Sequence, residues 1–206
     1  CLRRGIAPSG GRAPGSITEA LTKFFDIRDG RLSSLSAAER TDLADNIAVV
    51  ATGMRSNPSY AIIDRGEGQT PSMLPNTILS LGKSNKLRIP FVQGKFNMGG
   101  TGVLQFSGQR NLQLVISRRD PGVAQYETGG DKSLWGVTVV RREDPREGMR
   151  NSTFRYLAPG NQVISFEAES LPLWPDGPDD AYGSPLTGGT FIKLYEYDMQ
   201  GLKTNI

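Results

Sequence analysis

The sequence contains no histidine and a single cysteine, Cys1, and these two shortages exclude several kinds of chemistry. Without histidine the chain can form neither a Ser-His-Asp nor a Cys-His catalytic group, and no histidine-ligated metal site. One cysteine can build neither a cysteine-cluster metal site nor an internal disulfide. We therefore expect a reducing compartment, the cytoplasm.

Long apolar runs and a strong net charge are missing as well. No apolar run approaches the ~18 residues that a membrane-spanning helix needs, so a membrane partner is not expected. The formal net charge of +3 is small for 206 residues and does not indicate a nucleic-acid partner. Glycine and proline are abundant, with 25 and 13 residues, which predicts many turns. This composition is typical of a soluble protein with one large domain or two small ones.

The most informative stretch of the chain runs from Ala61 to Gly102. The apolar run Tyr60–Ile63 predicts a buried strand, and a carboxylate at its end, Asp64, is costly there unless it is hydrogen-bonded. A ligand with an exocyclic amine would satisfy that carboxylate. Gly66 and Gly68 allow positive φ and let a flat ring approach the backbone.

A second glycine cluster, Gly94–Gly102 (GKFNMGGTG), ends this stretch. The backbone N–H groups from Gly99 onward, just before a predicted helix at Val103, make an anion site suited to phosphates. A base at one end and phosphates at the other describe a purine nucleotide site. Glycine-rich turns are common, however, so a tight turn is the favoured alternative for the first glycine pair taken alone.

A basic segment with Lys83, Ser84, Lys86 and Arg88 lies between the two glycine clusters. A solvated basic loop and a phosphate-binding lid explain it equally well. In a lid, Lys83 or Lys86 would approach the β- and γ-phosphates as a point charge, and the Ser84 hydroxyl would help. We predict a short helix over Thr77–Leu81 at the start of this segment.

Three motifs, in this order, resemble those of the GHKL ATPases, the superfamily of gyrase, the Hsp-ninety chaperones, sensor histidine kinases and MutL. Asp64–Gly68 (DRGEG) is similar to the D-x-G-x-G box, and Gly94–Gly102 to the glycine box that ends the ATP lid. Gly189–Leu194 (GTFIKL) is similar to the late G-T-x-hydrophobic strand. The resemblance covers roughly Ile47–Tyr197 and is nearest to bacterial Hsp-ninety-like ATP-binding proteins of unassigned role.

The resemblance implies a fold, a ligand and a set of binding residues. The fold is an α/β two-layer sandwich of the Bergerat type, with a mixed, mostly antiparallel sheet and helices on one face, in a single ATP-binding domain over 1–206. Asp64 would accept from the adenine amino group, and Thr190 would support Asp64 or its water. The implied ATP-binding residues are Asp64, Gly66, Gly68, Lys83, Ser84, Lys86, Gly94, Lys95, Gly99, Gly100, Thr101, Gly102 and Thr190.

ATP and Mg²⁺ are the implied cofactors. The full-length protein is expected to hydrolyse ATP and to drive a conformational or homodimerisation cycle. Two alternatives are a nucleotide-binding switch without hydrolysis, and a structural or interaction module that keeps the fold and binds nothing.

The first box of the family, E-x-x-x-N-x-x-D-A, has no good counterpart. Its Asn holds Mg²⁺ and its Glu activates water, and the nearest candidate is Asp42–Asn46 (DLADN), which lacks the small-residue ending. We therefore expect the box upstream of Cys1, in a longer protein of which this chain is a piece truncated at the N-terminus and at the C-terminus. The chain alone would then have no catalytic residue and no ATP turnover. Residues 1–15 are interpreted as linker, and residues 82–102 as ATP lid and glycine box.

Local signals predict the remaining elements. Ser16 should cap a helix that reaches about Ile27 and is ended by Asp29-Gly30. A capping box of Ser36 with Glu39 should begin a second helix that ends near Asn46. Strands are predicted at 47–51, 60–63, 111–119, 134–142, 154–157, 163–169 and 190–197, with a surface loop over 171–186.

Four arginines, Arg141, Arg142, Arg146 and Arg150, could suggest an acidic partner. Acidic residues are interleaved with them, at Glu143, Asp144 and Glu147, so a solvated charged face is the favoured interpretation.

Overall fold

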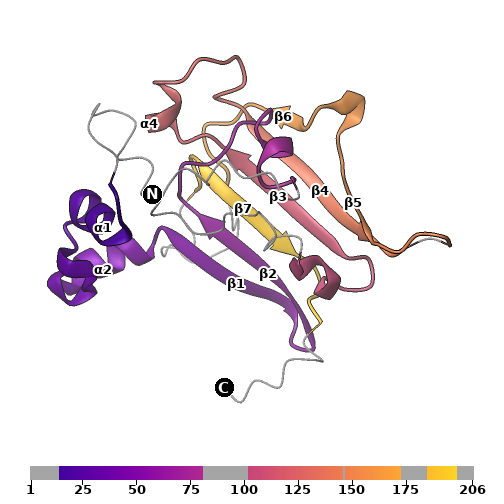
Figure 1. The fold of residues 1–206 in the computed structure, drawn as a ribbon, viewed down its shortest axis with the longest axis horizontal. Coiled ribbons are helices and arrows are strands. Elements are labelled where there is room, and N and C mark those ends of the chain that lie inside the picture. Colours follow the sequence, from indigo (N-terminus) through magenta and orange to yellow (C-terminus); the bar gives the residue numbers. More distant parts are fainter. Residues whose placement is uncertain (1–13, 81–101, 146, 173–184, 199–206) are drawn as a thin grey trace.

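The computed structural model describes residues 14–80, 102–145, 147–172 and 185–198. Its centre is one open seven-stranded sheet in the order β1-β2-β7-β3-β4-β5, with β6 also paired to β4 (Figure 1). The strands are β1 Ile47–Met54, β2 Asn57–Asp64, β3 Leu112–Arg118, β4 Trp135–Glu143, β5 Thr153–Tyr156, β6 Ile164–Phe166 and β7 Gly189–Leu194. Every strand pairing within these ranges is antiparallel, so the expectation of a mostly antiparallel sheet is confirmed.

The α-helices of the described residues are short: α1 Ile17–Phe25, α2 Ala37–Ala44 and α4 Pro121–Ala124. The Ser16 cap of α1 and the Ser36–Glu39 capping box of α2 are both present, as predicted. The first helix ends before Ile27, because Asp26 adopts a left-handed conformation with φ 53°. Figure 1 shows α1 and α2 beside the end of the sheet where β1 begins, and not across its face. None of the helices in the described ranges is long and apolar enough to cross a membrane.

The two helices predicted over Thr77–Leu81 and at Val103 are not α-helices in the residues that the structure describes. The turn over Leu74–Asn76 contains Pro75, which is favoured at a helix start, and Thr77–Leu79 forms only further turns. The predicted helix at Val103–Phe106 is likewise one 3₁₀ turn. The helix expected over Thr77–Leu81 is thus wrong for its described residues.

Alternation along the strands divides the core between the two faces of the sheet. One face carries Ala61, Ile63, Trp135 and Phe191, covered by Leu186. Leu186 also pairs with Leu171, and this bridge closes the base of the predicted surface loop, whose residues 173–184 lie outside the described ranges.

The other face, to which Asp64 belongs by register, is covered unevenly. Over β3 and β4 the two 3₁₀ turns bury Leu74 and Leu104 against Val115 and Val140. Over β1 and β2 large apolar side chains are exposed, with Ile47 at 64%, Val49 at 63% and Ile62 at 39%. A boundary between a covered and an exposed half therefore runs across this face, along β7.

Candidate functional site

A row of three polar side chains crosses the sheet at that boundary. The register sets Asp64 of β2 opposite Thr190 of β7, and Thr190 opposite Ser117 of β3. Directly opposite residues share a face, so the three side chains are neighbours. The hydroxyls of Ser117 and Thr190 are 3.2 Å apart and buried, at 0% and 7% exposure.

Asp64 is the half-buried member of the row. Its Oδ1 accepts from the Gly66 N–H at 2.9 Å, an Asx turn that orients the carboxylate as the chain leaves β2. The next residue is also anchored: Arg65 donates its N–H to the Asn46 carbonyl at 2.8 Å and its guanidinium to the Pro185 carbonyl at 3.0 Å. The end of β2 is therefore held on both sides of the turn.

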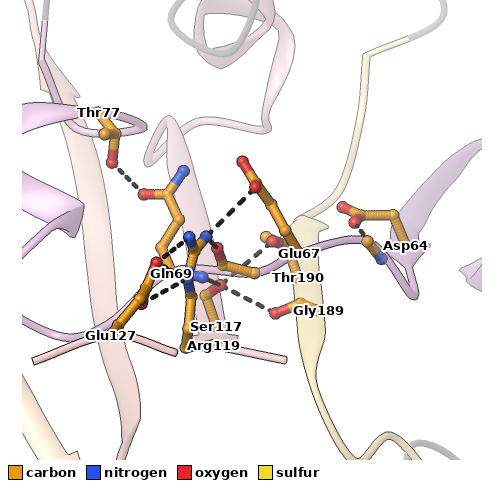
Figure 2. Close-up of polar contacts among 11 residues, drawn as sticks. Asp64, Glu67, Gln69, Thr77, Ser117, Arg119, Glu127, Gly189 and Thr190 are labelled. Carbon is orange, nitrogen blue, oxygen red and sulfur yellow. Dashed lines mark hydrogen bonds and ion pairs between the residues drawn. The ribbon is translucent and has the colours of Figure 1, made fainter. Parts of the chain in front are cut away.

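Ser117 organises the loop that follows. Its hydroxyl accepts from the Gln69 N–H at 3.0 Å and donates to the Gly189 carbonyl at 2.9 Å (Figure 2). The Gln69 side chain in turn accepts from the Thr77 hydroxyl. One buried serine thus connects β3, β7 and the loop after Asp64.

Two glycines allow the backbones to approach at this point. Gly68 has φ +57°, and a Cβ there would lie 1.8 Å from the Arg118 carbonyl oxygen. Gly189 has φ +119°, and its Cβ would lie 2.1 Å from the Asp64 carbonyl oxygen. Close backbone packing is a sufficient reason for glycine at both positions. For Gly68 this corresponds to the tight-turn alternative of the sequence analysis, which needs no ligand. A contact of Gly68 with a base stays a prediction.

A buried arginine directly after β3 is hydrogen-bonded to the same loop. Arg119 is only 8% exposed, and its Nη1 donates to the Gly68 carbonyl at 3.0 Å. Its Nε lies 2.9 and 3.0 Å from the two carboxylate oxygens of Glu127, and its Nη1 lies 3.5 Å from Glu67 (Figure 2). Burial lowers the pKa of Arg119, but the bonds to Glu127 and the charges of both carboxylates outweigh burial and leave the pKa raised.

The structure describes five of the predicted binding residues. Asp64 and Thr190 are paired across β2 and β7, and Gly66 and Gly68 form the loop beside them, while their contact with a nucleotide stays a prediction. Gly102 is exposed and directly precedes the 3₁₀ turn Val103–Phe106 with an ordinary right-handed φ, and a Cβ there would meet nothing within 4 Å, so no steric demand explains this glycine. The other eight lie outside the described residues: Lys83, Ser84, Lys86, Gly94, Lys95, Gly99, Gly100 and Thr101.

Asn46, the alternative candidate for a Mg²⁺ ligand, has a local structural role. Its Nδ2 donates to the carbonyls of Asp42 and Leu43, at 2.9 and 3.3 Å, and so satisfies the open end of α2. Among the residues described, no group of three or more His, Cys, Asp or Glu side chains could hold a metal ion.

Ser117 and Arg119 were missed by reasoning from sequence. A sequence signal for Ser117 was present, because Gln113 and Ser117 are polar residues on one face of a strand whose residues 112–116 are otherwise apolar. Both side chains are buried in the structure. Arg119 follows that strand directly, but nothing local marks it as more buried than Arg118. Comparison of the chain with models of known protein families and with curated proteins found no match.

Proposed function

We propose that this chain binds an adenine nucleotide at the row formed by Asp64, Thr190 and Ser117, as an ATP-binding domain of the GHKL type. The observation that supports this best is the register, which aligns a carboxylate at a strand end with two hydroxyls from neighbouring strands. In the proposed complex the Asp64 carboxylate accepts from the exocyclic amine of adenine. Thr190, whose hydroxyl lies 3.2 Å from that of Ser117, supports Asp64 or a water beside it.

The surroundings of the row suit a purine. Adenine has flat, largely apolar faces, and packing them against apolar side chains removes apolar surface from water and favours binding. Ile47 is paired with Asp64 across β1 and β2, Val49 is paired with Ile62 one row further, and all three apolar side chains are exposed. The Asx turn with Gly66 holds the carboxylate in place before a ligand arrives, which lowers the ordering cost of binding.

The remaining parts of the proposal concern residues outside the described ranges. The phosphates would be bound by the lid and glycine box over 82–102, with a helical layer completing a two-layer Bergerat-type sandwich. Mg²⁺ would neutralise phosphate charge when it is bound with ATP. Hydrolysis, a homodimer cycle and a cytoplasmic location are proposed for the full-length protein. For this chain alone we propose binding without turnover, because Asn46 is engaged in capping α2.

Asp64→Asn tests the proposal at its central residue. Asn keeps the shape and can still accept from the Gly66 N–H, so the fold should be preserved. The Asn side chain must then direct its oxygen to the Gly66 N–H, so that its NH₂ group, a donor, faces the adenine amine, which is also a donor. A hydrogen bond to a charged group contributes about 1.5–3 kcal/mol, so affinity for a non-hydrolysable ATP analogue should fall about ten-fold or more.

Calorimetric titration beside a thermal melt measures both effects, and Asp42→Asn is the matched control. It removes the same charge from the exposed α2 helix and should leave affinity unchanged. No binding by the natural chain, or equal losses in both variants, would contradict the proposal. A phosphate-release assay on the chain should show no turnover above background.

A further inference from the structure

A second polar site lies at the opposite end of β3, five residues from Ser117. It is an open depression of about 410 Å³ between the turn before β3 and the end of β4, lined by residues 109–111 and 141–144. Five residues of strand place it roughly 16 Å from the row at Asp64. It does not depend on the proposed nucleotide site.

The charges around the depression are unevenly paired. Its two carboxylates are engaged: Asp144 lies 2.9 Å from Arg142, and Glu143 lies 3.3 Å from Arg155 on the neighbouring strand. Arg110 and Arg141 are exposed and form no ion pair with any residue that the structure describes. Two arginines without an ion pair to any described residue therefore line one depression, which the interleaved acids in the sequence did not predict.

The backbone around these arginines is fixed. Asn111 adopts a left-handed conformation with φ 49°, which Asn tolerates better than most residues. Its carbonyl accepts from the Arg142 N–H at 3.1 Å, and its neighbour Leu112 is paired with Arg141 in the sheet. The turn and the strand end are thus hydrogen-bonded to each other, so the two arginines extend from a pre-formed frame.

We propose that this depression binds a small phosphate-bearing ligand, with Arg110 and Arg141 as its anion-binding residues. Guanidinium groups bind phosphate oxygens through two parallel hydrogen bonds, and a phosphate dianion matches two uncompensated positive charges. The volume is that of a small-molecule site. This limited volume favours a small ligand over a nucleic acid or an acidic peptide.

Titration of the ¹⁵N-labelled chain with inorganic pyrophosphate at constant ionic strength tests this. We expect saturable shifts of the amide signals of Arg110, Asn111, Arg141 and Arg142. The double variant Arg110→Gln/Arg141→Gln should lose about ten-fold or more in affinity while its spectrum stays that of the folded chain. Asp64→Asn should bind pyrophosphate at this depression as the natural chain does, which separates this site from the proposed nucleotide site.

The matched control is Arg31→Gln/Arg55→Gln, which removes the same charge from exposed positions elsewhere. Its affinity should stay within about two-fold of the natural chain. Equal losses in both double variants would show attraction by net charge only and would overturn the proposal. Shifts confined to other residues, or tighter binding of a glutamate-rich peptide than of pyrophosphate, would overturn it as well.

Discussion

Arg119→Met would test whether the buried ion cluster holds the loop after Asp64. The substitution removes the guanidinium but keeps most of the side-chain stem, so packing is little changed. What is lost are the bond to the Gly68 carbonyl at 3.0 Å, the paired contacts with Glu127 at 2.9 and 3.0 Å, and the weaker attraction of Glu67 at 3.5 Å.

The expected cost follows from the burial of each partner. Removing one member of a fully buried ion pair costs about 3–5 kcal/mol, because the other charge stays buried and unpaired. Here the side chains of Glu127 and Glu67 are 32% and 23% exposed, so water can reach both carboxylates once the guanidinium is gone. We therefore expect Arg119→Met to lower the free energy of unfolding by about 2–3 kcal/mol.

Urea unfolding of four proteins measures this effect: the natural chain, Arg119→Met, Glu127→Gln and the double variant. The two losses should not add, with a coupling of about 1–2 kcal/mol, because both variants break the same contacts. Arg155→Met is the control, since its partner is a carboxylate at 3.3 Å but its own side chain is 61% exposed, so its loss should stay below about 1 kcal/mol. If Arg119→Met costs no more than Arg155→Met, the cluster does not hold the loop.

Two further predictions concern the same loop and its support. Gly68→Ala places a Cβ 1.8 Å from the Arg118 carbonyl oxygen and should lower the free energy of unfolding in urea by more than about 3 kcal/mol. The control is Gly160→Ala, which has nearly the same φ of +61° but open space around it, and should lower that free energy by only about 1 kcal/mol. Similar losses in the two variants would refute the close approach at Gly68. Burial has the largest single effect on Asp131 and raises its pKa, but the hydrogen bonds to the carboxylate, first among them that from the Ser72 N–H at 2.8 Å, together outweigh burial and hold the pKa below its ordinary 3.8. A carboxylate whose pKa is lower in the folded than in the unfolded chain stabilises the fold fully only at pH values above its unfolded-state pKa. The decrease in melting temperature caused by Asp131→Ala should therefore be constant down to about pH 4 and should become smaller at lower pH. A decrease that stays the same on further acidification would contradict this role of Asp131.

Local sequence signals were sufficient for elements whose cause is local. The caps at Ser16 and Ser36 are present because each hydroxyl reaches a backbone N–H three residues away. Alternation predicted β3, and the strand predicted over 134–142 corresponds to β4. An apolar run ending in a carboxylate placed Asp64 at the end of β2. One-turn elements were predicted poorly, as at Thr77, because a single turn has too few residues to show a period.

Only the tertiary structure decided which residues meet at the candidate site. The late strand β7 inserts between β2 and β3, and this pairing alone sets Thr190 between Asp64 and Ser117. No local pattern encodes such a register, because it depends on which distant strands share an edge and on the two glycines that let their backbones approach. Arg119 is the clearest case: it and Arg118 are adjacent and chemically identical, and only the fold buries Arg119 against Glu127.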